Sequence, residues 1–330
     1  MTSKKHSSVT NQRTKQGLVL FSGGLDSILT VKILRKQKVK IKALYFKSCF
    51  LNENEAQKSA KKIRIPLKII DFSKEHLGVV KDPKHGYGSQ MNPCIDCRIS
   101  MLKKAKKIMG KEGFDFIATG EVIGQRPMSQ NRKVLQITEK ESSLSGHLLR
   151  PLSAKLLNET LIEKEGFIER KKLFAISGRS RKEQIKLAKE TKLQSYPSPA
   201  GGCLLTDPEF SKRLKVILKL WQKTPRNLKR EKNDIELLKL GRHFIENEIK
   251  IIVGRDNKEN KKIKKLALKN DILVEMENYP GPLTLIRNYR KRPFLKKGQE
   301  KALKKAKGLT RYYSTKSRNK KDAKFCIEKV

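Results

Sequence analysis

Residues 18–27 read LVLFSGGLDS, an apolar strand-like stretch that passes through two glycines into a segment of helical period. Backbone N–H groups beside the glycines can approach an anion closely, and the N-terminus of the following helix adds the positive end of its dipole. Two hydroxyl groups and one carboxyl group flank the glycines. We therefore predict a phosphate cradle, with a ligand-free strand-to-helix turn as the alternative, made of Ser22, Gly23, Gly24, Asp26 and Ser27.

This loop differs from a Walker loop, because no lysine follows its second glycine and its spacing is shorter. It resembles the SGGxDS pyrophosphate loop of ATP pyrophosphatases, which cut ATP between its α and β phosphates and adenylate a carbonyl oxygen. The resemblance implies that the loop binds the phosphates of ATP and that Asp26 holds or orients Mg²⁺.

The charge of the chain predicts a polyanionic partner. Its 330 residues include 77 Lys and Arg against 33 Asp and Glu, a formal net charge of +44. Such an excess is costly in self-repulsion unless a polyanion neutralises it, so nucleic acid is the first expectation. A general bias toward lysine is the alternative interpretation.

Neither a membrane role nor a disulfide framework is expected. A spanning helix needs about 20 consecutive apolar residues, and the sequence has no such run and no apolar signal-peptide centre near residues 1–16. The cysteines number five, which is odd, and this favours a reducing compartment. We therefore expect a cytoplasmic protein.

Apolar strand patterns alternate with helical patterns over the first part of the chain. Strands are expected at 17–21, 39–45, 67–71, 114–119 and 148–152, and helices at 28–36, 55–63, 98–109, 166–175 and 180–190. This alternation predicts an α/β fold, a Rossmann-like parallel sheet with helices on both faces and ligands beyond the strand carboxyl ends. The family resemblance makes that fold adenine nucleotide alpha hydrolase-like.

Composition divides the chain into four parts. We expect a disordered basic tail at 1–16, an ATP pyrophosphatase-type domain at 17–226, a small basic α+β domain at 227–290 and a basic tail at 291–330. The third part resembles an NFACT-R type RNA-associated domain, through VGRDNKEN at 253–260, NDI at 270–272 and PGP at 280–282. In the last part, residues 311–313 offer stacking and phosphate contacts to RNA, or the segment is simply unstructured.

Three cysteines form the second chemical signal. Cys94 and Cys97 bracket the start of a helix, where the dipole stabilises thiolates, and Cys203 follows two glycines. A CxxC pair and one distant cysteine can hold a [4Fe-4S] cluster with one iron free of protein, which could carry a sulfide. The alternatives are a persulfide and disulfide relay between Cys97 and Cys203, a structural pair, or Zn²⁺ with His85 or His147 as fourth ligand.

The stretch CIDCR at 94–98, a helix, and then ATGEVIGQ at 118–125 resemble the catalytic domain of ThiI-type tRNA sulfurtransferases, with MnmA-type 2-thiouridylases as more distant relatives. The resemblance implies ATP-dependent thiolation of a tRNA uridine, with Gly120 and Gln125 flanking the nucleotide and the three cysteines holding the cluster. It also implies a sulfur donor, such as a cysteine desulfurase or free sulfide. The THUMP and rhodanese regions of ThiI proteins have no counterpart in the sequence.

Further candidates are less specific. Asp96, between the two cysteines, is a candidate acid or base, or a helix cap. For RNA or phosphate contact we select four basic residues, although such a cluster is commonly just a solvated face: Arg126, Arg150, Arg179 and Arg181. Two rival functions are a non-catalytic RNA-binding protein with a relic nucleotide fold and an enzyme that adenylates another substrate. The modified uridine and the oligomeric state stay open.

Overall fold

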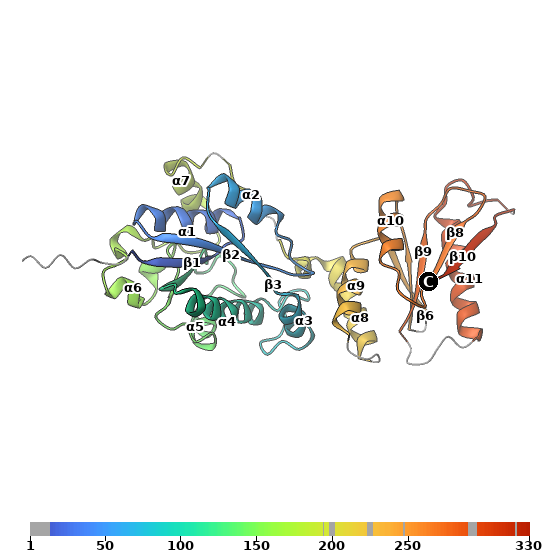
Figure 1. Cartoon of the computed structure of the whole chain (residues 1–330), viewed down its shortest axis with the longest axis horizontal. Coiled ribbons are helices and arrows are strands. Elements are labelled where there is room, and N and C mark those ends of the chain that lie inside the picture. Colours follow the sequence, from blue (N-terminus) through green and yellow to red (C-terminus); the bar gives the residue numbers. More distant parts are fainter. Residues whose placement is uncertain are drawn as a thin grey trace, which may run out of the picture. The chain divides into compact units, whose positions relative to one another are not determined.

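The computed structural model describes residues 14–193, 195–197, 202–222, 227–246, 248–289, 296–320 and 322–330. The chain divides into two compact units, which are described separately here (Figure 1). The first comprises residues 1–88 and 93–202, and the second comprises residues 89–92 and 203–330.

The first unit contains a five-stranded sheet in which every strand pair is parallel. The strand order is β3-β2-β1-β4-β5, and the strands are β1 (Gln16–Leu20), β2 (Lys40–Lys47), β3 (Leu67–Asp71), β4 (Phe116–Thr119) and β5 (Leu148–Leu149). The Rossmann-like α/β sheet predicted from the alternation of patterns is confirmed.

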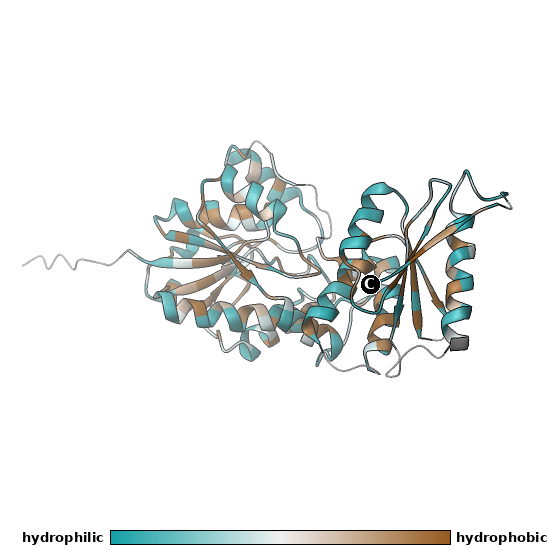
Figure 2. Cartoon of the chain, turned by 45° about the vertical axis from the view of Figure 1, so that its right-hand side comes forward, coloured by the Kyte–Doolittle hydropathy of each residue, from teal (hydrophilic) through white to brown (hydrophobic). Residues whose placement is uncertain are grey.

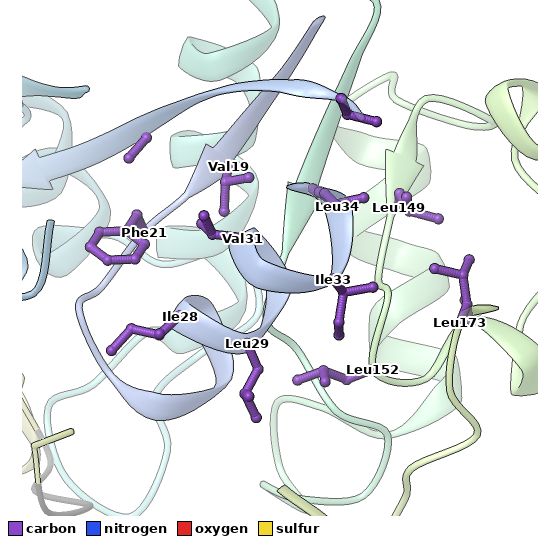
Figure 3. Close-up of a cluster of buried hydrophobic side chains, with 14 of the residues drawn as sticks. Val19, Phe21, Ile28, Leu29, Val31, Ile33, Leu34, Leu149, Leu152 and Leu173 are labelled. Carbon is purple, nitrogen blue, oxygen red and sulfur yellow. The ribbon is translucent and has the colours of Figure 1, made fainter. Parts of the chain in front are cut away.

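Helices cover both faces of this sheet (Figure 1). They are α1 (Leu25–Lys36), α2 (Asn54–Lys62), α3 (Ser73–Lys81), α4 (Cys94–Glu112), α5 (Arg132–Glu141), α6 (Leu161–Lys164) and α7 (Lys182–Glu190). Val19 and Phe21 pack with apolar residues of α1, as Figure 3 shows, and with those of α2 and α7, whereas Leu18 and Leu20 pack with α4. Because side chains alternate along a strand, a continuous apolar run serves both layers.

One local expectation for the first unit is wrong, and another is correct except for where the helix begins. Residues 166–175 form no α-helix but a single 3₁₀ turn, η2 (Arg170–Lys172), because backbone N–H groups of Phe174 and Ile176 donate to Pro151 and Leu152. The helix expected at 98–109 begins four residues earlier, at Cys94. Both cysteines of the CxxC pair therefore lie in its first turn.

The second unit is an antiparallel sheet with helices on both faces. Helices α8 (Pro208–Trp221) and α9 (Leu228–Leu238) precede β6 (Arg242–Glu246), β7 (Ile249–Val253), α10 (Asn257–Lys265), β8 (Ile272–Met276), β9 (Thr284–Asn288), α11 (Lys296–Tyr312) and β10 (Phe325–Lys329). The strand order is β10-β8-β9-β7-β6. Apolar residues of α11 pack on one face and those of α9 and α10 on the other. In both units the strands are largely apolar and the helices turn polar faces outward (Figure 2).

The segment 296–330 is part of this unit, which differs from the tail expected at 291–330. Ala302 and Ala306 of α11 are fully buried against the sheet, and β10 pairs with β8 over residues 325–329. The unit also extends back to Cys203, ahead of the boundary expected at 226, since α8 packs on α9 and the Trp221 Nε1–H donates to Asp234 at 2.8 Å. Residues 1–13 of the expected N-terminal tail lie outside the described residues.

Within the described ranges, no helix is long and apolar enough to cross a membrane.

Candidate active site

The predicted phosphate loop lies at the carboxyl end of β1, where the chain turns into α1. Gly23 has a φ of +82°, and a Cβ there would lie 2.6 Å from the carbonyl oxygen of Glu55. Only glycine meets both conditions without strain. The Ser27 hydroxyl donates to the Gly24 carbonyl at 2.8 Å, and the Ser22 hydroxyl lies 3.4 Å from that of Ser27. The structure therefore brings the hydroxyl groups and glycines of the predicted cradle together.

The end of β4 is pressed against the same loop. A Cβ on Gly120 would lie 2.7 Å from the backbone carbon of Asp26 and 2.8 Å from the backbone nitrogen of Ser27. This contact follows from the strand order, since β1 and β4 are neighbours and the loops after adjacent parallel strands meet at one edge. Glycine at position 120 thus lets the loop that follows β4 approach the cradle.

Asp26 is a mostly buried carboxylate at the start of α1. Its Oδ2 accepts a hydrogen bond from Nε2 of Gln125 at 2.8 Å, while its Oδ1 has no hydrogen-bond partner within the described part of the chain. Burial raises the pKa of the Asp26 carboxyl, and the Gln125 hydrogen bond and the charges of Arg181 and Arg126 oppose that shift. A buried carboxylate oxygen without a partner suits a cation, and Mg²⁺ is commonly bound by one or two carboxylates together with phosphate.

Cys97 lies next to a buried histidine that the sequence analysis missed. His76, on α3, is 1% exposed, and its Nε2 lies 3.5 Å from the Sγ of Cys97. Its Nδ1 lies 2.8 Å from the hydroxyl of Ser48. Burial lowers the pKa of His76 to about 4, so the imidazole beside the thiol is neutral at physiological pH. The sequence gives little indication of this contact, because the local pattern does not predict the helix α3 that carries His76.

Asp96 holds the loop in front of α4. Its two carboxylate oxygens contact the Nδ1 of His85 at 2.8 Å and accept the backbone N–H of His85 at 2.9 Å. The Nε2 of His85 in turn lies 3.2 Å from Glu141. Asp96 therefore fastens the preceding loop rather than capping α4, since the start of this helix has no side-chain cap hydrogen bond among the residues described. The acid or base role stays a prediction.

The four selected arginines lie in different environments. Arg126 and Arg179 are exposed and Arg181 is half-buried. Arg150 is only 2% exposed and donates to Glu121 at 3.2 Å and to Glu139 at 2.9 Å. Its place inside the fold differs from the surface position expected of an RNA contact.

Glu121 is the centre of an ion-pair group that sequence reasoning did not identify. It is 3% exposed and also pairs with the Nε of Arg98, one residue after Cys97, at 3.1 Å. Burial alone would raise the pKa of Glu121, but Arg98 and Arg150 together bring it below its ordinary value. The group links the first turn of α4 to the end of β4.

The described residues do not assemble a metal-ligand set. No group of three or more His, Cys, Asp and Glu side chains that could hold a metal is present in the described ranges. Cys94 and Cys97 lie in the first turn of α4, whereas Cys203 belongs to the second unit, just before the 3₁₀ turn η3 (Leu204–Thr206). Residues 198–201 of the loop before Cys203 lie outside the described residues.

Comparisons with known proteins identify two regions. Residues 13–163 match the family model "Thiamine biosynthesis protein (ThiI)", and residues 241–328 match "NFACT protein RNA binding domain". The second match reaches β10, beyond the limit of 290 expected for the small basic domain. It agrees with the packing of α11 and β10 onto the sheet.

Curated relatives match part of the chain. A tRNA-specific 2-thiouridylase MnmA of Karelsulcia muelleri is 30% identical over 138 residues, 38% of this chain and 35% of the relative. A probable tRNA sulfurtransferase of Thermoanaerobacter sp. is 29% identical over 143 residues, 41% of this chain and 36% of the relative. The chain therefore spans about a third of the length of these relatives.

Among solved structures, the U34-tRNA thiolase NcsA from Methanococcus maripaludis with its [4Fe-4S] cluster is 22% identical, with a TM-score of 0.33. The match covers 72% of this chain and 74% of that one. The chain thus contains one region that is similar to the ThiI family model, which includes the predicted phosphate loop and the CxxC pair, and a second region that is similar to the NFACT RNA-binding domain model.

Proposed function

We propose that the chain catalyses ATP-dependent thiolation of a uridine in tRNA. The observation that carries the proposal is the cradle of residues 22–27 with Gly120 packed against it and one buried oxygen of Asp26 left without a partner in the described structure. The CxxC pair in the same unit, and the family matches over 13–163 and 241–328, support a thiolation rather than another use of ATP.

In this mechanism the cradle holds the phosphates of ATP. Backbone N–H groups at Gly23 and Gly24 and the hydroxyls of Ser22 and Ser27 face the anion. Asp26 would hold Mg²⁺ through its free Oδ1, and the metal would neutralise charge on the phosphates. Gly120 and Gln125 flank the nucleotide from the opposite loop.

The uracil carbonyl oxygen attacks the α-phosphate, a bond to phosphorus forms, and the bond to the β-phosphate breaks to release pyrophosphate. Stabilisation of the transferred charge by positioned donors is the main catalytic contribution in such reactions. A sulfur nucleophile then attacks the activated carbon and AMP leaves, so the C=O becomes a C=S. A base in a folded tRNA must leave its stack to reach the pocket.

The route of the sulfur has two alternatives. Cys94, Cys97 and Cys203 would together hold a [4Fe-4S] cluster, or Cys97 carries a persulfide that Cys203 resolves as a disulfide. Because the described residues do not assemble a three-ligand group, we derive no step through the cluster. In either case the neutral His76 keeps the Cys97 sulfur in one place through their contact at 3.5 Å.

The second unit would bind the tRNA. Exposed lysines on α10 and the match of 241–328 to an RNA-binding domain support this role. The formal charge of +44 gives the whole chain a strong attraction for a polyanion.

The direct test is pyrophosphate release from ATP with and without tRNA, together with mass spectrometry of the digested tRNA after incubation with a sulfide source. We expect tRNA-dependent release and a new thiouridine, both abolished in Asp26→Ala. Full retention of activity in Asp26→Ala would contradict the proposal and favour a binding protein with a relic nucleotide fold. Pyrophosphate release independent of tRNA would favour an enzyme acting on another substrate.

The sulfur route is tested by anaerobic purification with iron and sulfide analysis. About four irons per chain, lost in Cys203→Ala, would support the cluster. An iron-free protein that still thiolates tRNA would favour the persulfide relay, and bound zinc would favour a structural site.

A further inference from the structure

A buried amide on α7 connects to the phosphate loop through Gln125. Gln184 is fully buried, and its Nε2 donates to the Oε1 of Gln125 at 3.1 Å. Gln125 in turn donates from Nε2 to Oδ2 of Asp26 at 2.8 Å. An ionised carboxylate only accepts hydrogen bonds, so Gln125 can bind Asp26 only through its NH₂ group. The hydrogen bond that Gln184 donates to Oε1 of Gln125 favours this same orientation of the Gln125 amide.

The loop that carries Gln125 and the chain leading into α7 are fastened together. The backbone N–H of Gly178 donates to the Ile123 carbonyl at 2.7 Å, and Ile123 and Ser177 form an isolated parallel bridge. A Cβ on Gly124 would lie 3.3 Å from the Gly178 nitrogen. Gln184 is therefore held at a fixed place relative to the Gln125 loop, as a positioning group requires.

This arrangement has a structural cost. The Oε1 of Gln184 is buried and accepts no hydrogen bond from any residue described. An unsatisfied buried carbonyl is unfavourable, and an apolar side chain of similar size would avoid that cost. A glutamine here is explained if its NH₂ group is needed to turn Gln125.

We propose that Gln184 is a positioning residue for the phosphate loop. It orients the Gln125 amide so that Nε2 engages Oδ2 of Asp26, and this leaves Oδ1 as the atom that faces the Mg²⁺ of bound ATP. The inference rests on the proposed function, because it assumes that the loop binds a magnesium nucleotide. It adds to that site a residue that lies 59 positions after Gln125 in the sequence.

A double-mutant cycle tests this proposal. The affinity for α,β-methylene ATP, which resists cleavage between the α and β phosphates, is measured by calorimetry with Mg²⁺ and with EDTA. The variants are Gln184→Met, Gln125→Met and the double variant. With Mg²⁺, we expect about tenfold weaker binding for each single variant, because the hydrogen bond to the charged Asp26 carboxylate is lost directly in Gln125→Met and through the misplaced Gln125 amide in Gln184→Met. The double variant should bind like Gln125→Met alone.

The chelator separates positioning from folding. In EDTA, Gln184→Met should bind the analogue as the wild type does, and its urea midpoint should not fall. Gln136→Met, on the exposed face of α5, is the matched control and should not change either affinity. Gln184→Glu, which keeps the shape but loses the donor, provides a second variant if the methionine does not fold.

Three results would overturn the proposal: wild-type affinity in Gln184→Met, additive losses in the double variant, or an equal loss with and without Mg²⁺. Failure of the wild-type chain to bind the analogue would instead contradict the proposed function, and the inference would fall with it.

Discussion

Gly23 shows how a single missing methyl group allows the tight turn of the predicted phosphate loop. We predict that Gly23→Ala removes nucleotide binding, because the new Cβ would lie 2.6 Å from the Glu55 carbonyl oxygen in a backbone conformation with φ of +82°. Gly166→Ala is the matched control, since Gly166 also has a positive φ, +74°, but open space around it. Gly166→Ala should lower the free energy of unfolding by only about 1 kcal/mol, through backbone strain. Calorimetry of nucleotide binding and urea unfolding of both variants measure the difference, and equal behaviour of the two would contradict this reading of the cradle.

His76 predicts a pH dependence of stability. Its pKa is lowered from 6.5 to about 4 by burial, so between these values the unfolded chain binds a proton that the folded chain does not. The contribution of the neutral imidazole to the free energy of unfolding is therefore complete above pH 6.5. It decreases as the pH drops toward 4, by about 3 kcal/mol in total.

Urea unfolding between pH 4 and 7 checks this prediction. The decline in stability should be smaller in His76→Phe, while His147→Phe, at a half-buried position, should follow the wild type. A His76→Phe profile parallel to the wild type would show that this group does not cause the decline.

At the scale of elements, buried charges tie the strands and helices of the first unit together. Arg150 follows β5 and reaches Glu121 at the end of β4 and Glu139 on α5. We predict that Arg150→Met destabilises the fold by about 3–5 kcal/mol, because removing one partner leaves buried carboxylate charge without compensation. Arg126→Met, at an exposed position, should leave the urea midpoint unchanged.

The measurement is urea unfolding together with tRNA affinity for each variant. If Arg150→Met kept full stability and lost tRNA affinity, Arg150 would be an RNA contact after all, and the structural reading would be wrong.

Much of the element order could be predicted from local patterns. The strand at residues 67–71 has its predicted limits, because a short run of apolar residues is a local signal. The 3₁₀ turn at residues 170–172 and the burial of Arg150 could not be predicted, since both depend on partners in distant segments. The same is true of α11, whose lysine-rich sequence looks like a solvated tail until the sheet covers its alanines.

At the scale of the whole molecule, charge should govern RNA binding. We predict that the affinity for tRNA falls steeply between 50 and 200 mM salt, roughly a thousandfold or more for six or more phosphate contacts. Changing the exposed Lys261, Lys262 and Lys265 of α10 to Gln should reduce the slope of log affinity against log salt by up to about three.

A triple change of exposed lysines on α4, at positions 103, 106 and 107, is the control with the same loss of charge. Equal slopes for the two triple variants would show that the overall field, rather than α10, attracts the RNA.

Sequence alone was sufficient for the strand-to-helix loop at residues 22–27, the parallel sheet and the two family resemblances, because glycines, apolar periods and short motifs act within a few neighbouring residues. Tertiary structure decided which side chains complete the site. The contact of Cys97 with His76 spans 21 positions, and the hydrogen bonds that link Gln184 to Gln125 and Gln125 to Asp26 span 59 and 99. Such pairs form only when β1, β4, α3 and α7 pack around one sheet, and no local propensity encodes that packing.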